Sequence, residues 1–203
     1  MEGDSDLDLL VLVSDELSAD DLTRLSSLHE TLLIEQPEAV LLEGDYVPCG
    51  WLLPTGTTRP VPFFRKGSLQ PNNELMLSAD NVANLRRDGI AVFGPRPTEV
   101  LPEVTADEVR AAVHEMLRDE PVAPNEEAAA HEILDLVRSL CAIETGMPTT
   151  KSDGVRWALE HVSPRWREVV LRADQIRRGA PTNEEESILR RALADMRAEL
   201  LLA

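Results

Sequence analysis

Short apolar runs alternate with polar stretches through the first part of the chain, and the pattern predicts strands and helices in alternation. Residues 7–13 form a continuous apolar run with β-branched side chains, which is typical of a strand buried on both faces. Ser18 precedes leucines at helical spacing, so we expect a helix that ends before Pro37. A second strand is expected over residues 38–43, and strand, helix, strand indicates an α/β unit.

The next stretch carries shorter apolar patches. Residues 51–64 predict an irregular hairpin, which its prolines confine to the edge of a sheet. A short helix is expected over residues 81–87 and a short strand over residues 90–93. The proline-rich segment that follows is the expected boundary between a domain of residues 1–97 and a domain of residues 98–203.

The pattern is helical after this boundary. Thr105 begins a capping box, Asn125 can cap a long helix, and Gly146 is a plausible C-cap for that helix. The last helix is expected to be capped by residues 182–185. We therefore expect a helical bundle. Its helices are expected after Thr105 and over residues 125–146, 151–161, 163–178 and 184–203.

The net charge of the chain limits the classes of molecule that it is expected to bind. The 203 residues include 20 Lys+Arg and 37 Asp+Glu, so the net charge is 20 − 37 = −17, which argues against nucleic-acid binding and favours cationic substrates. No apolar run is long enough to span a membrane, and the acidic start is unlike a signal peptide, so we expect a cytoplasmic protein. We also expect a monomer. The two cysteines lie far apart in the chain and are expected to be reduced.

Two aspartates carry the most informative spacing. Asp6 and Asp8 lie two apart on the expected strand, so their side chains point the same way, roughly 6.6 Å apart. Like charges at that spacing favour a bridging cation, and Mg²⁺ is bound in this way together with substrate phosphates. Glu43 could bring a third carboxylate to the same end of the sheet. The alternative is a solvated turn before the strand, and an ordinary strand-end acid at Glu43.

The residues around these acids resemble a known family. Residues 5–11 (SDLDLLV) are similar to the acidic strand of the polymerase-β-like nucleotidyltransferases. The whole chain resembles the aminoglycoside 3''-adenylyltransferase (streptomycin/spectinomycin adenylyltransferase) family. The resemblance continues in residues 42–48 (LEGDYVP), 88–95 (DGIAVFGP) and 144–151 (ETGMPTTK).

The resemblance implies an α+β protein, with a nucleotidyltransferase domain of mixed sheet and flanking helices before the helical bundle, and with ATP and acceptor bound between the domains. It implies Mg²⁺-dependent transfer of AMP from ATP to a hydroxyl of a cationic, aminoglycoside-type acceptor, as in antibiotic resistance. The implied roles are Mg²⁺ ligands for Asp6 and Asp8, catalytic base for Glu43, ATP contacts for Ser5 and Lys151, and substrate contact for His131.

Two departures from the family leave an alternative open. The family's Gly-Ser segment, which binds ATP phosphates upstream of the acidic strand, is missing here, so we expect either an upstream start or a shortened copy. Ala128 stands where drug-binding members carry an acid. Four nearby acids could line an anionic cleft or form a solvated helix face: Glu126, Glu127, Glu132 and Asp135. The alternative function is an impaired relative that acts as an antitoxin-like interaction protein.

Overall fold

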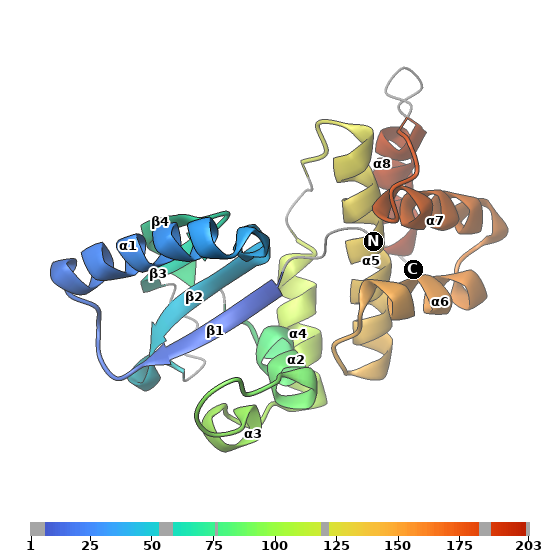
Figure 1. The fold of residues 1–203 in the computed structure, drawn as a ribbon. Coiled ribbons are helices and arrows are strands. Elements are labelled where there is room, and N and C mark those ends of the chain that lie inside the picture. Colours follow the sequence, from blue (N-terminus) through green and yellow to red (C-terminus); the bar gives the residue numbers. More distant parts are fainter. Residues whose placement is uncertain (1–6, 53–58, 76, 119–121, 183–187, 202–203) are drawn as a thin grey trace. The chain divides into compact units, whose positions relative to one another are not determined.

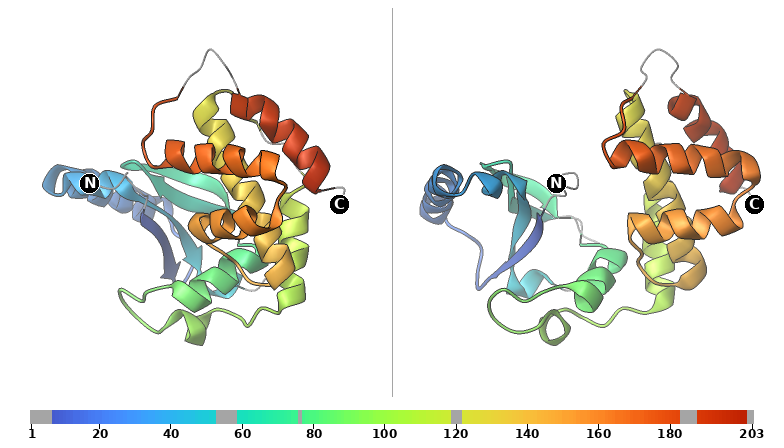
Figure 2. Two further views of the ribbon diagram at one scale, coloured as in Figure 1. Left: turned by 90° about the vertical axis from the view of Figure 1, so that its right-hand side faces the viewer. Right: turned by 45° about the vertical axis from the view of Figure 1, so that its right-hand side comes forward.

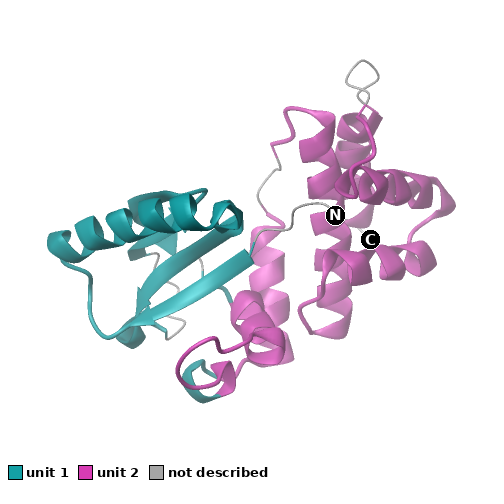
Figure 3. Cartoon of the chain, viewed as in Figure 1, with its two compact units in different colours: residues 1, 3–78, 99–102 teal, residues 2, 79–98, 103–203 magenta. Residues whose placement is uncertain are grey.

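The computed structural model describes residues 7–52, 59–75, 77–118, 122–182 and 188–201 of the chain. These residues fall into two compact units (Figure 3). One unit comprises the described residues up to Ser78 together with Glu99–Pro102, and the other comprises Ala79–Thr98 together with the described residues from Glu103 onward. The second unit thus contains residues 79–97, which the sequence assigns to the first domain. The functional boundary at residue 97 stays a prediction.

The first unit contains a mixed four-stranded sheet in the order β1-β2-β3-β4 (Figure 1). The strand β1 runs parallel to β2, and the pairs β2–β3 and β3–β4 are antiparallel. Its elements are β1 (Leu7–Val13), α1 (Ala19–Glu35), a 3-10 turn (Pro37–Leu41), β2 (Leu42–Pro48), a second 3-10 turn (Cys49–Trp51), β3 (Arg59–Arg65) and β4 (Ser68–Leu75).

The helix α1 covers one face of this sheet. Ser18 caps the helix through a capping box, as its position in the sequence predicts. On α1, the buried ring of His29 stacks on Phe64 of β3, and its Nε2 lies 2.6 Å from the hydroxyl of Tyr46 on β2. Phe64 and Tyr46 therefore lie on the helix-covered face, and neighbouring strand residues such as Glu43 point to the opposite face.

Three of the strand expectations need correction. The strand β1 has the expected bounds, but it lies at the edge of the sheet with Leu7 and Leu9 exposed, so it is not buried on both faces. Pro37 starts a 3-10 turn, and β2 therefore begins only at Leu42. The strand β3 is not at an edge, since it lies between β2 and β4. Its register with β4 shifts between Val61 and Phe63, on either side of Pro62, where β4 contains one residue more than β3.

The segment over residues 90–93 is irregular instead of forming the expected strand. Ile90, Val92 and Phe93 are 87%, 87% and 98% exposed, so their hydrophobic side chains are not part of a core. The strand β4, by contrast, was not expected, since its residues are mostly polar and carry no clear alternation. The expected helix over residues 81–87 is present as α2 (Ala79–Asp88).

The second unit is helical and is organised around α5 (Glu126–Thr145), as the views in Figure 2 show. The predicted caps are confirmed for Thr105, Asn125 and Gly146, which has a φ of 68°. The cap predicted over residues 182–185 falls largely on residues 183–187, outside the described residues. Besides α5, the helices are α2, α4 (Ala106–Met116), α6 (Lys151–His161), α7 (Pro164–Arg177) and α8 (Ile188–Leu200), while the short α3 (Pro97–Val100) is divided between the units.

The core of the helical unit lies along α5. Four residues near the middle of α5 are almost fully buried against the neighbouring helices: Ile133, Leu134, Leu136 and Val137. Glu126 at the start of α5 is also buried, and its Oε2 accepts a hydrogen bond of 3.2 Å from the backbone N–H of Leu189 at the start of α8. Among the described helices, none is long and apolar enough to cross a membrane.

Candidate active site

Two of the predicted site residues are direct neighbours in the sheet. Asp8 on β1 and Glu43 on β2 are register partners in the parallel pair. Partners in register point to the same face of a sheet, so the two carboxylates lie side by side on the face opposite α1. Ser5 and Asp6 lie outside the described residues.

Gly44 allows the strands to approach at this point. It is the register partner of Leu9, and a Cβ atom at position 44 would collide with the carbonyl oxygen of Leu9. The absence of a side chain at Gly44 therefore keeps β1 and β2 in contact next to the two carboxylates.

Glu43 also has a cationic partner. Arg65 on β3 is its register partner on the other side, and Arg65 Nε donates a hydrogen bond of 2.6 Å to Glu43 Oε1. The Glu43 side chain is only 14% exposed, whereas the Arg65 side chain is 52% exposed. Two carboxylates and one guanidinium group, from Asp8, Glu43 and Arg65, thus lie in a row across β1, β2 and β3.

The donor set suits Mg²⁺, although it is incomplete among the described residues. Carboxylate oxygens are hard ligands, and Mg²⁺ commonly takes one or two of them with phosphate and water oxygens. Asp8 presents one such carboxylate beside Glu43. Within the part of the chain that the structure describes, no group of three His, Cys, Asp or Glu side chains is arranged to hold a metal ion.

A second set of charged residues lies on one face of α5. His131, Asp135 and Arg138 follow one another at helical spacing, and His131 is exposed. Asp135 pairs with Arg138 at 3.1 Å and with Lys151 at 3.3 Å. Two cations therefore converge on one carboxylate, while no described contact brings His131 into this group.

The segment between α5 and α6 positions Lys151. Thr149 Oγ1 donates a hydrogen bond of 3.1 Å to the carbonyl oxygen of Arg138, and Thr150 caps α6 directly before Lys151. Gly154, one turn later, lies against α5, since a Cβ there would come within 2.7 Å of the Arg138 Cα. The two helices cross closely enough for Lys151 to reach Asp135.

Burial changes the proton affinity of two acids near these groups. The pKa of Glu132 on α5 is raised mainly by burial and further by the neighbouring Asp135 carboxylate. On β2, burial raises the pKa of Asp45, and a weak hydrogen bond of 3.4 Å from Asn73 opposes that shift. Both residues therefore hold a proton more readily than a solvated carboxylate does.

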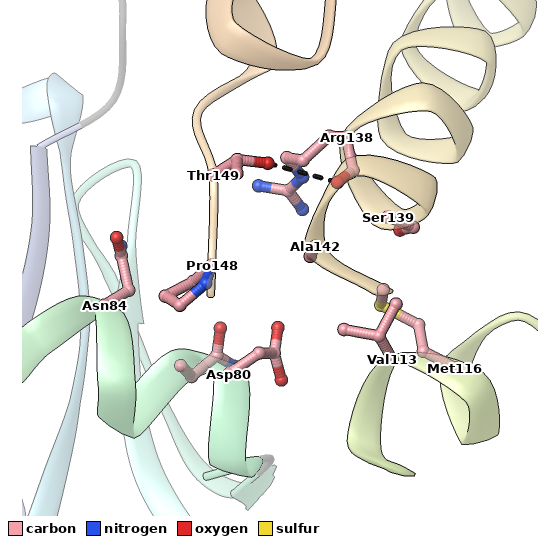
Figure 4. Close-up of a pocket in the computed structure, with 10 residues that line it drawn as sticks. Asp80, Asn84, Val113, Met116, Arg138, Ser139, Ala142, Pro148 and Thr149 are labelled. Atoms are coloured by element: carbon pink, nitrogen blue, oxygen red, sulfur yellow. Dashed lines mark hydrogen bonds between the residues drawn. The ribbon is translucent and has the colours of Figure 1, made fainter. Parts of the chain in front are cut away.

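Two cavities lie within the helical unit. One of about 40 Å³ has polar groups from α2, α5 and the Pro148–Thr149 segment on its walls (Figure 4), and it has room for water but not for a nucleotide. The other, of about 270 Å³, is lined mainly by apolar side chains together with Arg86 and Arg87. Neither cavity contains Lys151 or His131 in its lining.

Arg65 and Arg138 are candidate site residues that sequence reasoning missed. Arg138 was detectable, because it lies three residues after Asp135 and seven after His131, on the same helix face. Arg65 was not, because its pairing with Glu43 depends on the register of a hairpin whose second strand has no clear apolar pattern.

Comparison with known proteins agrees with the order of the two units. Residues 99–201 match the family described as aminoglycoside adenylyltransferase, C-terminal domain. The fold is similar to that of spectinomycin adenyltransferase AAD(9) from Enterococcus faecialis, whose crystal structure contains ATP and spectinomycin. The TM-score is 0.61 at 18% identity, over 95% of this chain and 85% of that one. No curated protein matches the chain.

Proposed function

The chain belongs to the aminoglycoside adenylyltransferase family, and on that premise we propose that it transfers AMP from ATP to a hydroxyl of an aminoglycoside acceptor. The chain is a nucleotidyltransferase. Its sheet unit has the nucleotidyltransferase fold and precedes the helical unit. The observation that carries the proposal is the pairing of Asp8 with Glu43 in adjacent parallel strands. We propose that it acts as a cytoplasmic monomer and binds no nucleic acid.

The sheet unit supplies the acid and base groups. Asp8, with Asp6, would hold Mg²⁺, which supplies positive charge to the triphosphate when it is bound. Glu43 accepts the proton of the acceptor hydroxyl. The hydroxyl oxygen then forms a bond to the α-phosphorus of ATP, the bond to the β-phosphate oxygen breaks, and pyrophosphate leaves.

The helical unit supplies the cations. Lys151 and Arg138 both contact Asp135, and both are about one third exposed, so they can exchange that carboxylate for phosphate oxygens. An arginine and a lysine on adjacent helices suit a triphosphate, because the guanidinium binds two oxygens and the ammonium acts as a point charge. In this proposal the helical unit therefore supplies cations for the triphosphate.

The acceptor is a polycation in this proposal. The net charge of −17 steers amine-bearing molecules toward the protein, and His131 lies on the same α5 face as the acids Glu127 and Asp135. Burial raises the pKa of Glu132, and a bound ammonium group would favour its ionised form.

The test is pyrophosphate release from Mg·ATP by the purified chain with a panel of aminoglycosides that includes streptomycin and spectinomycin. We expect release that depends on one drug and is lost in Asp8→Asn. The matched control is Asp15→Asn, which removes an exposed carboxylate just beyond β1 and should leave release unchanged. Absence of release with every acceptor, together with absence of ATP binding, would overturn the proposal and favour an interaction protein.

A further inference from the structure

The backbone of a tight turn holds Arg65, the hydrogen-bond partner of Glu43, in position. Arg65 ends β3, and the two-residue turn Lys66–Gly67 follows at once, with φ values of 48° and 79°. Positive φ at both residues is typical of the tight turns that hold hairpin strands in one register. Gly67 is also packed against α1, because a Cβ there would overlap the side chain of Leu33.

This turn places the Arg65 guanidinium beside Glu43. The register pairs Arg65 with Ser68 on β4 and with Glu43 on β2, so a slip of the hairpin would move Arg65 away from the carboxylate. The contact is a charge-assisted hydrogen bond at 2.6 Å to Glu43 Oε1. Glu43 is mostly buried at 14% exposure, so this bond acts on a side chain that water reaches only in part.

We propose that Arg65 is a positioning residue for Glu43, an inference that rests on the proposed function. The bond to Oε1 fixes the rotation of the carboxylate and presents Oε2 to the acceptor hydroxyl. During transfer the proton of that hydroxyl moves to Oε2, and Arg65 keeps its own protons throughout. Arg65 thus acts through Glu43, without contacting the reacting atoms.

The expected cost of losing Arg65 lies in kcat. Misplacement of a catalytic group by about 1 Å lowers the rate on the order of 100-fold, and a freed glutamate side chain would be displaced by at least that much. Binding of ATP and acceptor does not involve Arg65, so both KM values should stay close to those of the wild type. An ordinary exposed ion pair would leave kcat unchanged.

The experiment compares Arg65→Met with Lys66→Met, which removes the same charge one residue later in the turn. We expect a fall in kcat on the order of 100-fold for Arg65→Met, with KM unchanged, and no change for Lys66→Met. Added guanidinium ion should restore part of the lost kcat, because the Arg65 side chain is half exposed and its place is accessible from solvent. In a Glu43→Gln background, Arg65→Met should cause no further loss.

Three results would overturn the inference. The first is a kcat for Arg65→Met close to that of the wild type. The second is a raised KM with an unchanged kcat, which would make Arg65 a substrate contact. The third is a loss of kcat in a folded Arg65→Met variant that added guanidinium does not restore. If Arg65→Met fails to fold, Arg65→Lys takes its place in the comparison. An inactive wild-type chain would instead overturn the proposed function.

Discussion

The two units hold their candidate site residues in place by different means. In the sheet unit, backbone pairing across three strands positions Asp8, Glu43 and Arg65. In the helical unit, Asp135 lies on α5 and Lys151 on α6 reaches it where the two helices cross closely. A one-residue slip in a strand turns a side chain to the other face, whereas a small shift of a helix moves a side chain only slightly. The sheet unit should therefore tolerate less change.

The largest expected effect tests whether the sheet unit supplies the chemistry. Glu43→Gln removes the proposed base, so kcat for AMP transfer should fall by about 10²–10⁴-fold with KM for ATP little changed. Steady-state kinetics of pyrophosphate release measure both parameters. The control is Glu38→Gln, an exposed acid in the preceding 3-10 turn. A kcat near the wild-type value would remove Glu43 from the mechanism.

The next effect tests how closely β1 and β2 approach each other at a glycine of the sheet unit. Gly44→Ala places a Cβ against a carbonyl oxygen of the β1–β2 ladder and should cost about 1–3 kcal/mol of stability, with loss of transfer activity. Urea unfolding measures the cost. Gly50→Ala is the control, since nothing lies within 4 Å of a Cβ at that position. Equal stability of the two variants would contradict a close approach of β1 and β2 at Gly44.

A smaller effect tests whether the helical unit supplies binding instead of chemistry. Lys151→Met should raise KM for ATP by about tenfold or more, because a hydrogen bond to a charged group contributes roughly 1.5–3 kcal/mol. The value of kcat at saturating ATP should change little. Isothermal titration with ATP gives an independent readout, and an unchanged affinity would refute this role. Lys66→Met serves as the control for loss of one positive charge.

The smallest effect is a pH dependence confined to the sheet unit. Burial lowers the pKa of His29 in the folded state, so the unfolded chain takes up the proton first. The contribution of His29 to stability is therefore complete above the unfolded pKa of about 6.5 and falls as the pH drops toward the lower folded pKa. Unfolding followed by fluorescence at pH 7.5 and at pH 5.5 measures it.

The control for this pH effect uses a histidine from each unit. His29→Gln cannot titrate and should unfold with a weaker pH dependence than the wild type. His131→Gln, which changes an exposed histidine of the helical unit, should leave the dependence as it is in the wild type. The same dependence in all three proteins would show that His29 does not contribute.

How far the sequence predicts the structure also differs between the units. The helical unit was predictable because its signals are local: Thr105 and Asn125 cap helices and Gly146 ends one, as expected. The sheet was predictable only in part, because strand pairing joins distant residues. The partner of Glu43 depends on a hairpin turn at Lys66, and Pro62 lies inside the sheet at a point where the β3–β4 register shifts.

The candidate site shows the same limit. Asp8 and Glu43 are adjacent, as the sequence suggested they could be, but the strand bounds differ: Glu43 was expected at the end of a strand over residues 38–43 and lies near the start of β2. Lys151 contacts an acid that the sequence placed in a possible cleft, but its pairing with Asp135 needed the helix crossing. The roles proposed for Glu43, Lys151 and His131 remain predictions.

The helix α2 has a consequence for what happens when the chain is cut. It belongs to the helical unit, where Val82 is fully buried, yet it precedes the exposed segment of residues 90–93. A chymotrypsin-like protease would cleave after Phe93, which is 98% exposed. The two fragments should remain associated, because the first carries a helix that packs against α4 in the second. Residues 90–93 are therefore a natural point at which to divide this protein for fragment complementation.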